Sequence, residues 1–282
     1  DVFEKGGFDC VLGNPPWEVS QLSEEEFFAS RKPSLSTLNG AKRKAAIEEL
    51  KTKEQTLWQE YCDSKTGFEK SNCFFRSCGR FIKTAVGKVN LYSLFADLMS
   101  QIVFDTGYAG IIIPSGIATD DSTKNFFASI SQNRRLISLI DFENRDALFK
   151  GVHRSYKFCC LTIGRSTAAK FSFFLTNTDQ LKDQRRQLTL TPAEITLLNP
   201  NTRTCPVFRS QYDADLTKKI YRAAPVLIDE NKGSQGNPWN ISFSQGLFNM
   251  TSDSHIFKNH EELVNKGGTL EGAVFYVAGE KF

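Results

Sequence analysis

The chain alternates between short, continuous apolar runs and longer segments in which apolar residues recur every three to four positions. Five runs have the length and composition of buried strands: residues 10–12, 108–114, 136–142, 156–163 and 170–175. Helical spacing of apolar residues between these runs predicts helices over 91–103 and 122–131. Strands and helices in this alternation predict an α/β fold built on a doubly wound, mostly parallel sheet.

A long segment, residues 18–88, separates the first two of these strands and predicts a helical insertion. Ser23 followed by three glutamates is a helix-start pattern, and residues 40–62 read as one long helix. Basic patches at residues 42–44 and 51–53 fit a solvated helix face better than a phosphate-binding one. We expect this insertion to overhang the carboxyl end of the first strand.

The C-terminal third has a different pattern. Residues 181–187 are charged and poor in apolar positions, which makes them the predicted boundary between a domain at 1–187 and a second region at 188–282. Thr191-Pro192 predicts a helix start, and residues 210–223 are amphipathic. Beyond residue 229, Gly, Asn, Ser and Pro become dense and the apolar period is lost.

Composition excludes several classes of protein. The 282 residues are 40% apolar and 24% charged, with a net charge of +3 that permits nucleic-acid binding without demanding it. Seven scattered cysteines, with no signal peptide and no long apolar span, indicate reduced thiols in a cytoplasmic protein that has no membrane contact. The three histidines form no ligand motif, so we expect no metal.

The stretch with the most specific chemistry is Asn14-Pro15-Pro16-Trp17, directly after the first strand. The prolines fix the backbone and remove two N–H donors, and Pro15 holds Asn14 in an extended conformation. The stretch therefore offers amide and carbonyl acceptors beside an aromatic ring, at the strand end where open α/β sheets bind ligands. Two such acceptors can take both hydrogens of an exocyclic amino group, localise its lone pair and aim it at an electrophilic methyl group. The same loop fits any planar amino or amide group.

Asn14-Pro15-Pro16-Trp17 resembles motif IV of the S-adenosylmethionine-dependent amino-methyltransferases. Gly87-Lys-Val-Asn-Leu-Tyr, a helix and Gly107-Tyr-Ala-Gly-Ile-Ile-Ile-Pro114 are similar to motifs V and VI of the gamma group of N6-adenine DNA methyltransferases. More narrowly, the order of motifs resembles the fused restriction–modification enzymes (type IIG) and the related phage-exclusion methyltransferases. The resemblance covers almost the whole chain.

The resemblance implies a cofactor, a partner and site residues. S-adenosyl-L-methionine would be the methyl donor and double-stranded DNA the substrate, with the target adenine extruded from the helix. Asn14, Pro15 and Pro16 would hold its amino group, and Trp17 would stack on the base. Phe149 matches the motif VIII aromatic that stacks on the opposite face, with Phe142 and Phe158 as competitors. Residues 188–282 would connect to the beginning of a target-recognition domain.

The resemblance also implies a missing half. Gamma-group enzymes carry the glycine-rich turn and the ribose-binding acid before motif IV, and only about a dozen residues precede Asn14 here. We therefore expect the C-terminal half of a methyltransferase sheet, whose partner is the missing N-terminal part of the same polypeptide, and an inactive fragment that does not bind the cofactor alone. Two rival interpretations stay open: a methyltransferase acting on a glutamine amide or an RNA base, and a non-catalytic DNA-binding fragment.

Overall fold

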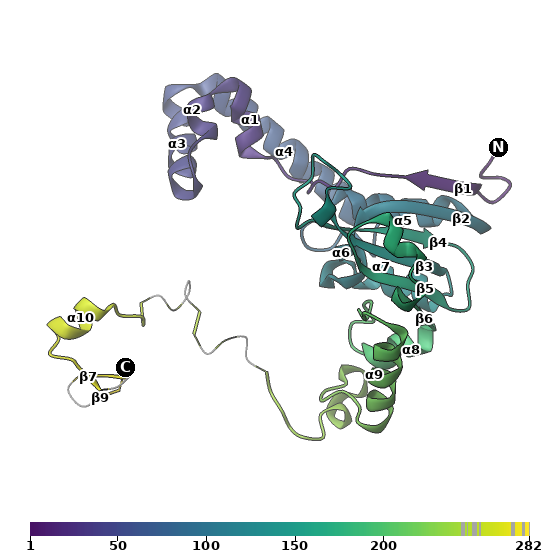
Figure 1. The fold of residues 1–282 in the computed structure, drawn as a ribbon. Coiled ribbons are helices and arrows are strands. Elements are labelled where there is room, and N and C mark those ends of the chain that lie inside the picture. The colour runs from purple at the N-terminus through teal and green to yellow at the C-terminus, as the bar shows by residue number, and fades with distance from the viewer. Residues whose placement is uncertain are drawn as a thin grey trace.

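The computed structural model describes residues 1–243, 246, 248–249, 253, 255–271, 274–277 and 280–281. A six-stranded sheet with helices packed on one face forms the main body, and a helical arm projects from the end of the sheet where β1 (Phe8–Gly13) ends (Figure 1). This arrangement confirms an α/β fold.

The sheet has the order β1-β2-β4-β3-β5-β6. Its other strands are β2 (Val103–Pro114), β3 (Leu136–Glu143), β4 (Lys157–Ile163), β5 (Ala169–Leu175) and β6 (Gln187–Leu190). β1 pairs with β2 and β3 pairs with β5 in parallel, whereas β4 is antiparallel to both β2 and β3, and β6 is antiparallel to β5. The sheet is therefore mixed: β1, β2, β3 and β5 run in one direction, whereas β4 lies between β2 and β3 and runs opposite to both, and β6 runs opposite to β5.

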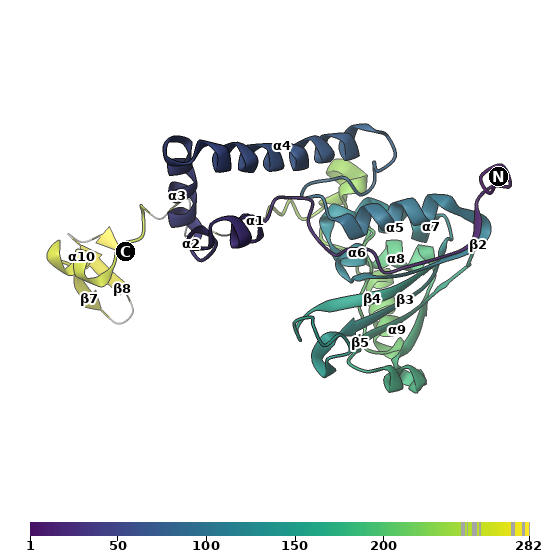
Figure 2. The same cartoon turned by 90° about the horizontal axis from the view of Figure 1, so that it is seen from above.

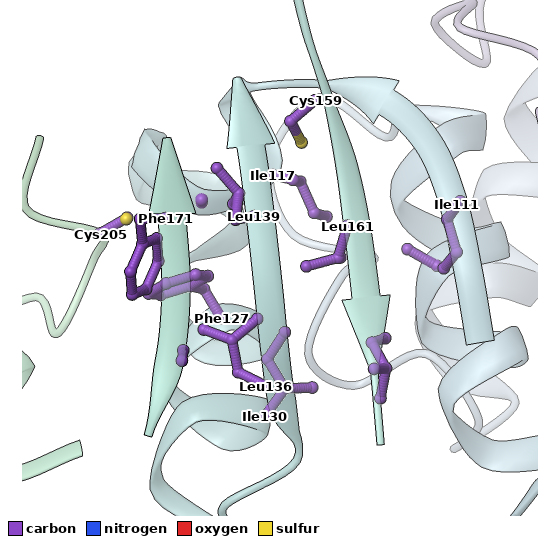
Figure 3. Packing of buried hydrophobic residues seen from close by; sticks show 14 of the residues in the cluster. Ile111, Ile117, Phe127, Ile130, Leu136, Leu139, Cys159, Leu161, Phe171 and Cys205 are labelled. Carbon is purple, nitrogen blue, oxygen red and sulfur yellow. The ribbon is translucent and has the colours of Figure 1, made fainter. Parts of the chain in front are cut away.

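Apolar side chains on one face of the sheet form the main core. Ile111 of β2, Leu139 of β3 and Leu161 of β4 point to this face and are at most 2% exposed (Figure 3). The same core takes in five helices: α5 (Leu91–Ile102), α6 (Gly116–Thr119), α7 (Lys124–Gln132), α8 (Pro192–Leu198) and α9 (Gln211–Ala223). Each fully buried aliphatic side chain contributes about 1.5–3 kcal/mol, so this face holds the sheet and its helices together.

The opposite face of the sheet is much less covered near β1. Leu12 is 79% exposed and Tyr108 is 56% exposed, although both are large apolar side chains on sheet strands. Leu12 lies over Gly110, where an added Cβ would meet its Cδ2 at 2.7 Å. Toward β3 and β5 this face closes over an aromatic cluster that includes Phe142 and Phe158.

The predicted insertion forms a helical arm with a small core of its own. It consists of α1 (Glu24–Arg31), α2 (Pro33–Ser36), α3 (Gly40–Lys53) and α4 (Gln55–Ser77). Ser23 caps α1 as predicted, since its side chain accepts from the Glu26 N–H. The single long helix expected over 40–62 is wrong: the chain turns at Glu54, whose ψ of 70° is not helical. The turn lets α3 cross α4, so that Ile47 and Leu50 pack with Tyr61 in one cluster (Figure 2).

The predicted boundary near residue 187 falls inside the main core. β6 joins the sheet beside β5, and Leu188, Ile195 and Ala214 are buried in the same cluster as the strands. Thr191 and Glu194 form the capping box of α8, which confirms the predicted helix start. The packing therefore extends the main body to α9, and a recognition domain beyond it stays a prediction.

Past α9 the described residues form η5 (Glu230–Gly236), α10 (His260–Asn265) and a small sheet of β7 (Thr269–Glu271), β8 (Val274–Val277) and β9 (Glu280–Lys281), and this sheet is drawn apart from the main body in Figure 1. Part of the predicted recognition region, including residues 250–252, lies outside the described residues. None of the helices that the structure describes combines the length and apolarity needed to cross a bilayer.

Candidate active site

The loop that follows β1 presents its acceptors to solvent. Asn14 and Pro16 are exposed, whereas Pro15 is buried. Within the described residues, the Asn14 amide and the carbonyl oxygens of Pro15 and Pro16 take part in no hydrogen bond. The oxygens of the two exposed residues, Asn14 and Pro16, are therefore available to an N–H donor brought to the end of β1.

The chain after the loop is anchored, which keeps the loop from moving freely. The Ser20 N–H donates to the Val89 carbonyl at 2.8 Å, and the Leu91 N–H donates to the Glu18 carbonyl at 2.9 Å. Val19 and Asn90 form the β-bridge between these two bonds. These bonds hold residues 89–91, which lead into α5, beside the Asn-Pro-Pro-Trp loop, although 71 positions separate Val19 from Asn90 in sequence.

Trp17 lies in an aromatic cluster rather than standing alone in solvent. Its indole Nε1 donates to the Ile112 carbonyl of β2 at 3.2 Å. Its ring stacks on Tyr156, with centroids 5.7 Å apart and planes 19° apart, and on Phe158 at 6.0 Å. These contacts fix the ring plane, so Trp17 can offer an oriented surface to a planar ligand.

Phe149 reaches the same cluster from the loop after β3. Its ring meets Trp17 edge to face, with centroids 6.1 Å apart and planes 81° apart. A base held between two parallel rings needs about 7 Å between them, twice the usual contact distance. The structure therefore brings Trp17 and Phe149 together, and a clamp around a base would require one ring to turn.

Asn144 is the residue that holds the Phe149 loop. It is fully buried, its Nδ2 donates to the carbonyls of Phe149 and Val152, and its Oδ1 accepts from the Phe149 N–H. The Asn144 N–H also donates to the Tyr156 carbonyl at 2.9 Å. One buried amide thus ties together both ends of the loop that carries the aromatic residues.

Sequence reasoning missed Tyr156, because it was assigned to the strand. The structure begins β4 one residue later and leaves the Tyr156 side chain 40% exposed against Trp17. A second neighbour is Tyr92 of α5: burial, with Asp120 and Tyr156 nearby, raises the pKa of Tyr92 to about 12. Its hydroxyl therefore stays protonated at neutral pH. The only sequence signal for either residue was an aromatic at the edge of a predicted element.

The arrangement suits the holding of a planar amino group better than acid–base catalysis. The oxygens at the end of β1 without a hydrogen-bond partner among the described residues come from an amide and from proline carbonyls, none of which titrates near neutral pH. Among the described residues, no group of three or more His, Cys, Asp or Glu could hold a metal ion. The chemistry open to this loop is alignment and polarisation of a bound N–H₂ group.

Comparison with known proteins finds similarity to restriction-modification enzymes. Residues 61–149 match the family model described as the Eco57I restriction-modification methylase. This part of the chain is similar to a restriction-modification methylase. Over 194 residues, 68% of the chain is 30% identical to the type II restriction enzyme and methyltransferase RM.Eco57I of Escherichia coli. The aligned part spans 18% of the length of that curated relative.

Solved structures align weakly. The methyltransferase subunit of a type I restriction-modification system from Streptococcus thermophilus covers 48% of this chain and 35% of its own, at 12% identity and a TM-score of 0.34. The DNA-bound type ISP restriction-modification enzyme LlaBIII covers 67% of this chain and 12% of its own, at 9% identity and a TM-score of 0.36. Because these TM-scores are low, the fold is assigned from the strand order of the chain itself.

Proposed function

We propose that this chain carries the target-base side of an adenine-N6 DNA methyltransferase that belongs to a restriction–modification or phage-defence enzyme of the gamma group. The observation that carries the proposal is the set of acceptors on Asn14, Pro15 and Pro16, which lie at the end of β1 and have no hydrogen-bond partner among the described residues. The similarity to a restriction enzyme and methyltransferase supports the same reaction and a fused, type IIG-like parent.

The reaction requires a nucleophilic amino group on adenine. The Asn14 side-chain oxygen accepts one hydrogen of that group, and a carbonyl of Pro15 or Pro16 accepts the other. These two bonds localise the nitrogen lone pair and fix its direction, which supplies positioning and electrostatic stabilisation without a strong base. S-adenosyl-L-methionine supplies the methyl group when it is bound.

The aromatic cluster provides the surface for an extruded base. Trp17 is oriented by Tyr156 and by the Ile112 carbonyl, so its stacking plane is set before the base arrives. Phe149, held by Asn144, contacts the edge of the same ring and is the candidate for the second stacking face. Tyr156 joins these proposed residues because it lies exposed against Trp17.

The cofactor site and the rest of the sheet are proposed to come from a βα segment of the same polypeptide. The outer edge of β1 pairs with no other strand in the described part of the chain, and Leu12 and Tyr108 are exposed beside it. Right-handed crossovers that add strands outward from β1 place their helices on that exposed face. The complete sheet would then be doubly wound, and residues after α9 would lead to the recognition domain.

Nucleoside analysis of DNA from cells that express the complete polypeptide tests the proposal. The host should lack its own methyltransferases, and the DNA should gain N6-methyladenine. Methylated cytosine in this DNA, or new methylation found when RNA and protein from the same cells are analysed, would each contradict the adenine assignment. No methylation at all would favour a DNA-binding role without catalysis.

A further inference from the structure

A loop surface beside the proposed active site has an unusual distribution of charge. Residues 70–96 contain no Asp or Glu, although the chain has 32 of them in 282 residues. The same stretch holds five cationic residues, which we call the basic loop surface: Lys70, Arg76, Arg80, Lys83 and Lys88. All five are exposed, so the surface is positive over the end of α4 and the loop that follows it.

These cations are not neutralised within the protein. None of the five forms an ion pair with any described residue, whereas α3 pairs Lys51 with Glu48 and Lys53 with Glu49. Only Arg76 is engaged, through a bond of 2.8 Å from its Nη2 to the Gly87 carbonyl. The charges of Arg80, Lys83 and Lys88 therefore remain free to attract an anion.

The loop that carries them is rigidly attached to α5. Phe81, Ala85 and Val89 are buried in one cluster with Leu94. Beneath them the Thr84 hydroxyl donates to buried Asp97 at 3.1 Å. The Gln101 amide of α5 also donates to the Arg80 carbonyl at 2.9 Å. An anchored loop loses little conformational entropy when its cations bind a ligand.

The position of the loop connects it to the site. Its last residues, Val89 to Leu91, are hydrogen bonded to residues 18–20, which directly follow Trp17. Figure 2 shows α4 ending on the side of α5, so the connecting loop lies against the main body and not at the tip of the arm. A polyanion that reached the basic loop surface would therefore also pass the Asn-Pro-Pro-Trp loop.

We propose that the basic loop surface binds the phosphate backbone of duplex DNA and so positions the duplex beside the active-site loop. The choice of duplex DNA rests on the proposed function. The charge, exposure and anchoring of the loop are observations that do not depend on the proposed function. Contacts of this kind set the register and orientation of DNA without reading its sequence.

The test is binding of the 282-residue chain to a labelled duplex by fluorescence anisotropy across a range of salt concentrations. The triple variant Arg80→Gln, Lys83→Gln, Lys88→Gln removes three charges from the surface. The matched control Lys5→Gln, Arg134→Gln, Lys170→Gln removes three exposed charges at the opposite end of the sheet, before β1 and β3 and at the start of β5. Thermal melts and circular dichroism establish that both variants fold.

Each lost phosphate contact lowers the slope of log K against log salt by about 0.9. The surface variant should therefore bind more weakly, with a slope smaller by about 2.7 (three contacts at 0.9 each), while the control keeps the parental slope. Equal losses in both variants, no loss in either, or no binding by the parental chain at low salt would each overturn the proposal. Methylation is not the readout, so failure of the proposed function leaves this result interpretable.

Discussion

Trp17 has both a structural contact and a proposed ligand contact. Its Nε1 donates to the Ile112 carbonyl and its ring packs on Tyr156 and Phe158, so removing the side chain leaves a cavity as well as a missing stacking surface. Cavity formation at a buried aromatic costs about 3–5 kcal/mol, and less for a half-buried ring such as this. A measurement of base stacking by Trp17 must therefore separate the lost stacking from the loss of protein stability.

Two DNA duplexes achieve this separation. Trp17→Ala should weaken binding to a duplex whose target adenine is unpaired by about 1–3 kcal/mol more than it weakens binding to the fully paired duplex. Any structural damage affects both duplexes equally. Titration of the complete polypeptide with each duplex gives the difference, and an equal loss for the two would remove Trp17 from the stacking role.

At the scale of residues, the sequence predicted the loop but not its surroundings. Asn14, Pro15 and Pro16 were identifiable because prolines determine the local backbone whatever lies around them. The edge-to-face contact of Phe149 with Trp17 and the hold of Asn144 on the loop depend on strands distant in sequence. No local pattern encodes such contacts, so Tyr156 and Asn144 were found only in the structure.

At the scale of elements, α8 and α9 are joined by a buried cation. The Lys218 side chain is 8% exposed, and its Nζ lies 2.8 Å from both Glu194 and Asp215. Burial alone would raise the pKa of Glu194, but hydrogen bonds from Lys218 and Thr191 outweigh it and lower the pKa. The carboxylate is thus stabilised in its charged form.

Lys218→Met should destabilise the protein by about 2–3 kcal/mol, because Glu194 would keep a half-buried charge without its partner. Lys219→Met, an exposed neighbour, should change stability by less than about 0.5 kcal/mol. Because the folded pKa of Glu194 is lowered, its contribution is present above about pH 5 and lost as pH falls further. Urea unfolding from pH 3 to 8 measures the free energy of unfolding of the parental protein and of both variants. If Lys218→Met destabilised the protein as much at pH 3 as at pH 8, the result would argue against the ion pair.

The elements themselves were largely predictable, and their arrangement was not. Apolar runs located the strands from β1 to β5 because buried strands need continuous apolar sequence. The break between α3 and α4 at Glu54 is not marked by a glycine or a proline. It depends on the packing of α3 against α4, which the local sequence does not reveal. Likewise the charged segment before β6 predicted a domain boundary, yet β6 completes the sheet edge.

At the scale of the whole molecule, the exposed part of the sheet has a measurable consequence. The outer edge of β1 pairs with no strand that the structure describes, and with Leu12 and Tyr108 exposed beside it this edge can pair with another chain. The 282-residue chain should therefore self-associate, and Leu12→Ser, Tyr108→Ser should reduce this. Leu216→Ser, Tyr212→Ser is the control, with the same residue types exposed on α9. Sedimentation at several protein concentrations measures the self-association of each variant. Equal reductions by the two pairs of substitutions would contradict a role for the exposed sheet edge.

The central claim is that the Asn14 amide activates the amino group of adenine. Transfer of a radiolabelled methyl group from S-adenosyl-L-methionine to duplex DNA by the complete polypeptide tests it most directly. Asn14→Ala should lower turnover about a hundredfold or more while DNA affinity changes little, because phosphate contacts dominate that affinity. Asn133→Ala, an exposed asparagine before β3, should leave both unchanged. Full methylation of adenine by the Asn14→Ala variant would contradict the account.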